Sequence, residues 1–139
     1  MIRLRRPAPL ADLAAMTAAL SPPAFLATFG AYGAAATHLA HTRSWGFWAG
    51  DLCVACAGLQ ELGPHALEAW FACRPEACRH MVGVIGTMRL TLPMICEAER
   101  VEIRARVAEG WEPGRRIARA LDFHLAEAGA VETWIRGRA

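Results

Sequence analysis

The residues with the clearest chemical potential form the stretch CRPEACRHM, at positions 73–81, which follows a strand-like run and opens a long apolar helix. Many coenzyme-binding folds place a glycine-rich turn at such a junction, because glycine lets the backbone approach a phosphate and leaves the first helical amides free to bind it. This turn contains no glycine, and its positions are held by Arg74, Ala77, Cys78 and Arg79. It is either a binding turn that has lost its glycines or a helix start that never bound a nucleotide.

The cysteines are the second set of residues to consider for chemistry. Cys53 and Cys56 form a CxxC, but LCVACAGL has the pattern of a strand, on which side chains three residues apart point to opposite faces. No second CxxC follows, so the sequence does not predict a metal site. With an odd total of five cysteines, free and buried thiols are expected.

Charge and composition exclude several classes of protein. The net charge of +2 is too small to indicate a nucleic-acid-binding protein, and nucleic acid is an unlikely partner. The arginines of the last third alternate with glutamates, which predicts an ion-paired surface. The sequence shows no apolar run as long as the roughly 18 residues that a membrane span requires. Pro7, Pro9 and Asp12 interrupt the apolar start, so a secretory signal peptide is not expected and the membrane is not a predicted partner.

Hydrophobic periodicity predicts an alternation of strands and helices along 139 residues, enough for one domain. The clearest strand is RVEIRARV, in which Val101, Ile103 and Val107 share one face. Trp70 and Trp134 share strand faces with polar residues, so they are either core residues or exposed anchors for a partner. Helices are predicted at 10–20, 22–40, 76–92 and 112–123, and strands at 2–6, 44–51, 52–62, 66–73, 100–107 and, as a pair around Gly129, 123–137.

This order of elements, with the opening IRLRRPAPLADLAAM and the later RIARALDFHLAEAG, resembles the GCN5-related N-acetyltransferase (GNAT) superfamily over essentially the whole chain. The resemblance implies an α+β fold, in which about four helices flank a mixed, mostly antiparallel twisted sheet. It also implies a splay between the fourth and fifth strands. Residues 1–139 are then a single GNAT-like domain.

The resemblance also assigns roles to the candidate residues. In active GNATs the turn after the fourth strand reads Gln/Arg-x-x-Gly-x-Gly/Ala and binds the pyrophosphate of acetyl-CoA. Arg74 matches the first position, whereas Ala77 replaces the first glycine and Arg79 the last small residue, with Cys78 between them. Glu68, on the fourth strand, is the possible general base, and a solvated or ion-paired strand carboxylate is the alternative.

The general-acid positions of the family are filled by residues that cannot do its chemistry. Catalytic GNATs commonly place an asparagine at the start of the penultimate helix and a tyrosine seven residues later, where it protonates the departing thiolate. Those positions hold Trp111 and Ala118 here, and the single tyrosine, Tyr32, lies far away in the sequence. A retained scaffold with a degenerate acetyl-CoA site is therefore expected.

The stretch EAWFACRPEACRHM is similar to GNAT-like proteins of tailed phages and prophages, the group that includes internal virion protein A-like chains. That resemblance implies a virion or assembly protein that requires no cofactor and acts through protein partners, either phage structural proteins or further copies of itself. It would be found in the bacterial host cytoplasm or in the phage particle. The alternative is an active acetyl-CoA-dependent N-acetyltransferase of unknown acceptor.

Overall fold

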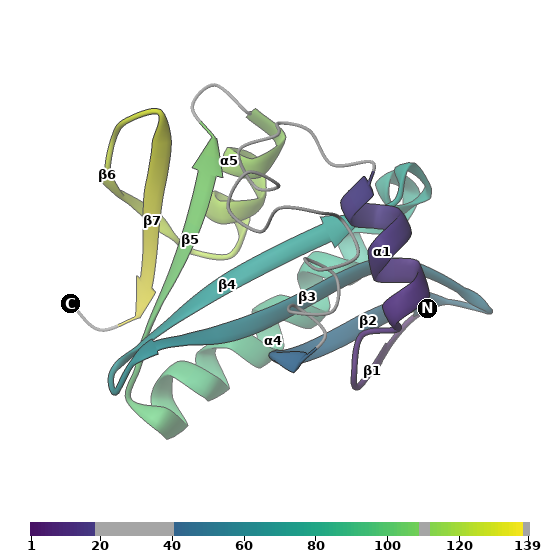
Figure 1. The fold of residues 1–139 in the computed structure, drawn as a ribbon, viewed down its shortest axis with the longest axis horizontal. Helices are drawn as coiled ribbons and strands as arrows, with labels where there is room; N and C mark the ends of the chain where they lie inside the picture. The colour runs from purple at the N-terminus through teal and green to yellow at the C-terminus, as the bar shows by residue number, and fades with distance from the viewer. Residues whose placement is uncertain (19–40, 109–111, 138–139) are drawn as a thin grey trace. The chain divides into compact units, whose positions relative to one another are not determined.

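A computed structural model describes residues 1–18, 41–108 and 112–137. Seven strands form one sheet in the order β1-β2-β3-β4-β5-β7-β6. In chain order the elements are β1 (Ile2–Arg5), α1 (Leu10–Ala18), β2 (Arg43–Ala49), β3 (Leu52–Gly63), β4 (Ala66–Cys73), the 3₁₀ helix η1 (Pro75–His80), α4 (Met81–Glu99), β5 (Glu102–Ala108), α5 (Glu112–Ala120), β6 (His124–Glu127) and β7 (Val131–Gly137) (Figure 1).

The sheet confirms the predicted mixed topology. β1 with β2, β2 with β3, β5 with β7 and β6 with β7 pair antiparallel, whereas β4 and β5 pair parallel. The parallel register covers only Ala66–Ala69 of β4 and Glu102–Ala105 of β5, although both strands continue beyond it. This limited pairing is the splay that was predicted between the fourth and fifth strands. The helix predicted at 22–40 lies outside the described residues.

The chain packs as two compact units, Met1–Leu59 with Phe71–Val84, and Gln60–Trp70 with Ile85–Ala139. In the first unit, the buried core includes Leu13 and Met16 of α1 together with Phe47 and Val54 of the sheet. The amide of Ala8 donates to Ser44 Oγ at 3.0 Å, which satisfies a buried hydroxyl and fixes the chain before α1. That residues 1–139 form a single domain stays a prediction.

The CxxC prediction was wrong about the direction of the two side chains. Phe47 of β2 faces Ala55, but the next residue, Trp48, faces Cys53, so β3 carries an extra residue at this point. Such a bulge shifts the alternation of side chains along the strand. Cys53 and Cys56 are consequently both buried, with their Sγ atoms 3.8 Å apart. The hydrogen bond with Cys53, together with burial, raises the pKa of the Cys56 thiol.

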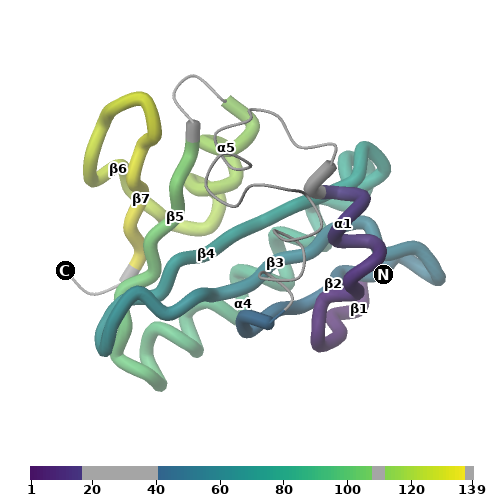
Figure 2. The backbone as a smooth tube through the Cα atoms, viewed as in Figure 1, coloured from purple at the N-terminus to yellow at the C-terminus, as the bar shows by residue number. Residues whose placement is uncertain are grey.

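In the second unit, β5 lies between β4 and β7, and the chain ends in the β6–β7 hairpin, drawn in yellow in Figure 2. Val101, Ile103 and Val107 are buried while Arg104 and Arg106 are exposed, which confirms the alternation predicted for this strand. Ile103 and its neighbours therefore form the apolar face on which this unit is built.

Helix α4 is longer than predicted. Pro93 was expected to end or kink the helix, but α4 continues through it to Glu99. The continuous helical segment Pro75–Glu99 is also long and apolar enough to cross a membrane by length and composition, contrary to the expectation from sequence. Only 6% of its most apolar stretch is buried, although Val84, Met88 and Leu92 lie inside the protein.

For two tryptophans the sequence left both a core and an exposed position open. Trp70 and Trp134 are only 9% and 4% exposed, so the core interpretation of both is confirmed. On β4, Trp70 and Ala72 are buried while Phe71 and Cys73 are half-buried. Trp45 and Trp48 are half-buried, and the guanidinium groups of Arg6 and Arg5 lie 5.3 and 5.9 Å from their ring centres.

Candidate functional site

The candidate coenzyme turn follows β4 directly. Arg74 is the N-cap residue with extended backbone angles (φ −89°, ψ 159°), as expected before Pro75, because proline disfavours the helical region for the residue that precedes it. The 3₁₀ helix Pro75–His80 then leads into α4 through Met81, which has helical angles. The sequence therefore placed the turn correctly, between a strand and the long helix.

The backbone of this turn offers few free amides to a phosphate. A helix start binds anions through its first N–H groups, which lack partners within the helix. Pro75 has no N–H, and the amide of Ala77 donates to the carbonyl of Arg74 at 3.0 Å. Glu76 adds a carboxylate in the first turn, where it interacts favourably with the helix dipole itself and repels a second anion.

The guanidinium of Arg74 is engaged inside the first unit. It forms an ion pair with Asp12 of α1, and its Nε donates to the carbonyl of Cys53 at 3.0 Å. The backbone amide of Arg74 also donates to the carbonyl of Val54, at 2.9 Å. Only about a quarter of the Arg74 side chain is exposed. Arg74 thus connects the end of β4 to α1 and β3, and its charge is already balanced by Asp12.

The other three residues of the turn have different environments. Ala77 is buried (1% exposed), whereas Cys78 and Arg79 are exposed. Arg79 therefore supplies a positive charge that a solute can reach, and Cys78 is a free thiol on the same turn. Burial raises the pKa of the neighbouring Cys73 thiol, with a smaller effect from Cys78, so Cys73 is a poor nucleophile.

Glu68 is ion-paired on the sheet of the second unit. Its Oε2 lies 3.8 Å from Nε of Arg106, and about a quarter of the side chain is exposed. This is the alternative that the sequence left open for Glu68, a strand carboxylate that balances a neighbouring arginine. To act as a general base, Glu68 would have to break its ion pair with Arg106 and contact the substrate amine instead.

The general-acid position at Ala118 lies in the core. Ala118 is 4% exposed on α5 and cannot donate a proton to a leaving thiolate. Trp111, the other position named from the resemblance, and Tyr32 lie outside the described residues. Within the described ranges, no group of three His, Cys, Asp or Glu side chains could hold a metal ion.

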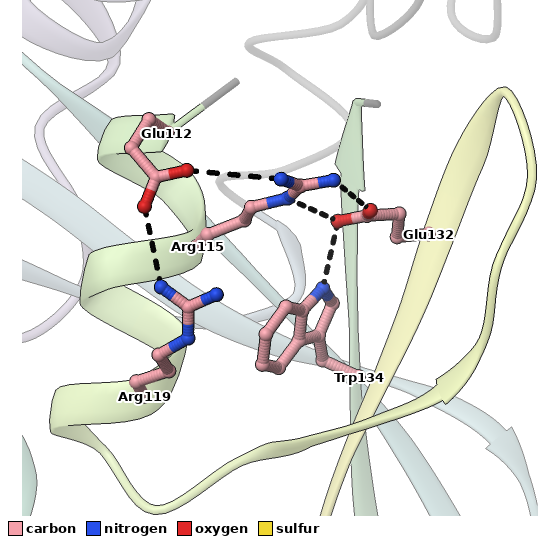
Figure 3. Close-up of polar contacts among 5 residues, drawn as sticks. All are labelled: Glu112, Arg115, Arg119, Glu132 and Trp134. Carbon is pink, nitrogen blue, oxygen red and sulfur yellow. Dashed lines mark hydrogen bonds and ion pairs between the residues drawn. The ribbon is translucent and has the colours of Figure 1, made fainter. Parts of the chain in front are cut away.

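A polar cluster between α5 and β7 was missed from the sequence (Figure 3). Arg115 contacts both carboxylate oxygens of the buried Glu132, with Nε donating to Oε1 at 3.0 Å, and Trp134 Nε1 donates to the same oxygen at 3.2 Å. The hydrogen bond from Arg115 lowers the pKa of Glu132. Glu112 pairs with Arg119, whose guanidinium lies 5.6 Å from the Trp134 ring centre. These contacts hold α5 against β7.

Several arginines of the last third are ion-paired, as predicted. Besides the cluster between α5 and β7, Arg104 pairs with Glu102 and Arg136 with Asp122. The charges of these arginines are thus offset by neighbouring carboxylates.

No protein-family model and no curated protein matches the sequence. Solved structures do match. The N-acetyltransferase PaiA of Thermoplasma acidophilum, in complex with coenzyme A, is 14% identical, with 99% of each chain covered and a TM-score of 0.74. Ard1 of Thermoplasma volcanium is 13% identical, with 97% of this chain and 96% of that chain covered and a TM-score of 0.74. A GNAT-family acetyltransferase of Bacillus anthracis is 10% identical over 96% and 92%, with a TM-score of 0.66.

The chain has the GNAT fold. This agrees with the sheet order and the splay, and it confirms the fold expected from the sequence resemblance. At these levels of identity the likeness extends to the fold alone, because one fold hosts many functions.

Proposed function

We propose that this GNAT-fold protein acts through protein contacts and does not transfer acetyl groups. The observation that carries the proposal is the state of the coenzyme turn: Arg74 is held by Asp12 and the Cys53 carbonyl, and the Ala77 amide donates to the Arg74 carbonyl. Both a charge and a donor that would bind pyrophosphate are thereby used within the protein. Ala118, at the position of the general acid, supports the same conclusion.

The specific role we propose is that of a virion component or assembly factor of a phage or prophage. It rests on the resemblance of EAWFACRPEACRHM to phage-carried GNAT-like chains. Such a protein would occur in the host cytoplasm and in the particle. Two observations test the role: phage capsid or tail genes beside this gene, and the protein at stoichiometric copy number in purified particles by mass spectrometry. A location among metabolic genes and absence from particles would contradict it.

The second candidate is an acetyl-CoA-dependent N-acetyltransferase. It is favoured by the similar fold of PaiA, which was solved in complex with coenzyme A, and by the exposed Arg79, which could contact a phosphate. In this function Glu68 would be the base, released from Arg106, and acetyl-CoA would bind at Arg74–Arg79. The acceptor amine is not indicated by any residue of the chain.

An acetyl-transfer assay separates the two candidates. We expect the purified protein, supplied with acetyl-CoA and a panel of polyamines, peptides and amino sugars, to release CoA no faster than buffer does, because Ala118, at the acid position, cannot donate a proton. Glu68→Gln should then behave as the unmodified protein. CoA release above background that Glu68→Gln abolishes, and that the matched Glu127→Gln on the exposed β6 leaves intact, would establish the enzyme instead.

A further inference from the structure

One side of α4 is apolar and exposed. Val82, Leu90 and Met94 are 92%, 74% and 69% exposed, and Gly86, also exposed, lies between them. Their spacing of four or eight residues places them in one row along the helix. The opposite side carries the buried Val84, Met88 and Leu92. Single exposed apolar residues are common on proteins, but a row of three large ones on one helix is typical of an interaction surface.

The row is complementary to itself when two helices run antiparallel. Suppose that two antiparallel copies of α4 cross at the level of Met88. A residue that lies a given number of positions before Met88 in one copy then faces the residue that lies the same number of positions after Met88 in the other copy. Val82 then faces Met94, so that two apolar side chains meet. Gly86 faces Leu90, so that the large leucine side chain lies opposite a residue without a side chain. Small residues opposite large ones are what close helix packing requires.

The charges at the ends of the row follow the same symmetry. Arg79 lies one turn before Val82 and Glu97 one turn after Met94, and both are exposed. In the antiparallel pair, Arg79 of each copy faces Glu97 of the other. Opposite charges at both ends favour this register and disfavour the parallel arrangement, in which like charges would face each other.

We propose that the exposed row of α4 is a self-association surface that joins two copies of this chain in an antiparallel helix pair. This inference rests on the proposed function, a protein that acts through protein contacts, and names a second copy of the chain as the partner. Dimerisation can nevertheless be measured whether or not the protein transfers acetyl groups. The 19 residues of α4 span about 28 Å. A helix pair of this length is at the small end of specific interfaces, so a dissociation constant of about 1–100 µM is expected.

Analytical ultracentrifugation of the full chain across this concentration range tests the proposal. We expect a monomer–dimer equilibrium whose dissociation constant rises at least about tenfold in Leu90→Arg. The matched control is Leu125→Arg, because Leu125 is exposed on the edge strand β6; this variant should dimerise unchanged. Circular dichroism checks that both variants fold, which the exposure of both leucines favours.

A charge exchange tests the register itself. Arg79→Glu and Glu97→Arg should each weaken the dimer several-fold, and the double variant should return to within about threefold of the original dissociation constant, because each new pair again joins opposite charges. A chain that is monomeric at all concentrations would overturn the proposal, as would a dimer that Leu90→Arg leaves intact. Binding of the monomer to phosphatidylcholine–phosphatidylglycerol vesicles, in place of dimerisation, would also overturn it.

Discussion

Glu132→Gln is expected to lower the urea midpoint of unfolding strongly at pH 7 and progressively less as the pH falls below about 4.3. The substitution removes the carboxylate that contacts Arg115 and Trp134, while Arg115 stays half-buried between α5 and β7 (Figure 3). Because contact with Arg115 lowers the pKa of Glu132 in the folded protein, this stabilisation is fully present above the unfolded pKa of about 4.3. The stabilisation is lost as the pH falls through the pKa of Glu132 in the folded protein, because Glu132 of the unmodified protein then becomes protonated and loses its charge.

Urea titrations at several pH values between 7 and 3 provide the measurement. The matched control is Glu127→Gln, because Glu127 is exposed on β6; its midpoint should follow that of the unmodified protein throughout. A difference between Glu132→Gln and the unmodified protein that is independent of pH would show that the charge of Glu132 does not hold α5 to β7.

Arg74→Ala is expected to lower the free energy of unfolding by about 1–3 kcal/mol, since it removes a charge-assisted hydrogen bond to Asp12 and one to the Cys53 carbonyl. The control is Arg79→Ala on the same turn, where the exposed side chain should contribute less than about 0.5 kcal/mol to the stability of the monomer. The measurement is chemical denaturation of both variants. Equal effects of the two substitutions would mean that Arg74 is not held inside the first unit and is free to bind a ligand.

Local patterns in the sequence predicted much of the fold. The alternation from Val101 to Val107 identified β5, and the Gly50-Asp51 turn (Gly50 φ 61°) identified the β2–β3 hairpin, because both signals depend on neighbouring residues. The CxxC prediction failed because a bulge is a property of two paired strands. Trp134 was open to both interpretations because its polar neighbour, Glu132, suggested a solvated face; Glu132 is itself buried, against Arg115.

The sequence singled out the candidate turn, but it did not predict the contacts that the residues of the turn make. Arg74, Ala77, Cys78 and Arg79 stand out by their order after a strand. Whether Arg74 is free depends on Asp12, which lies 62 residues away in the chain, and no local pattern connects the two. The ion-paired state of Glu68 likewise depends on Arg106 of a strand that is distant in sequence, although the parallel pairing of β4 and β5 aligns them.

Titration of the intact chain with coenzyme A by isothermal calorimetry measures binding at residues 74–79 without assuming an acceptor. We predict no saturable heat up to about 1 mM coenzyme A, which corresponds to a binding free energy weaker than about −4 kcal/mol. Saturable binding in the micromolar range that Arg79→Glu reduces at least tenfold would contradict it and would identify residues 74–79 as a working coenzyme site.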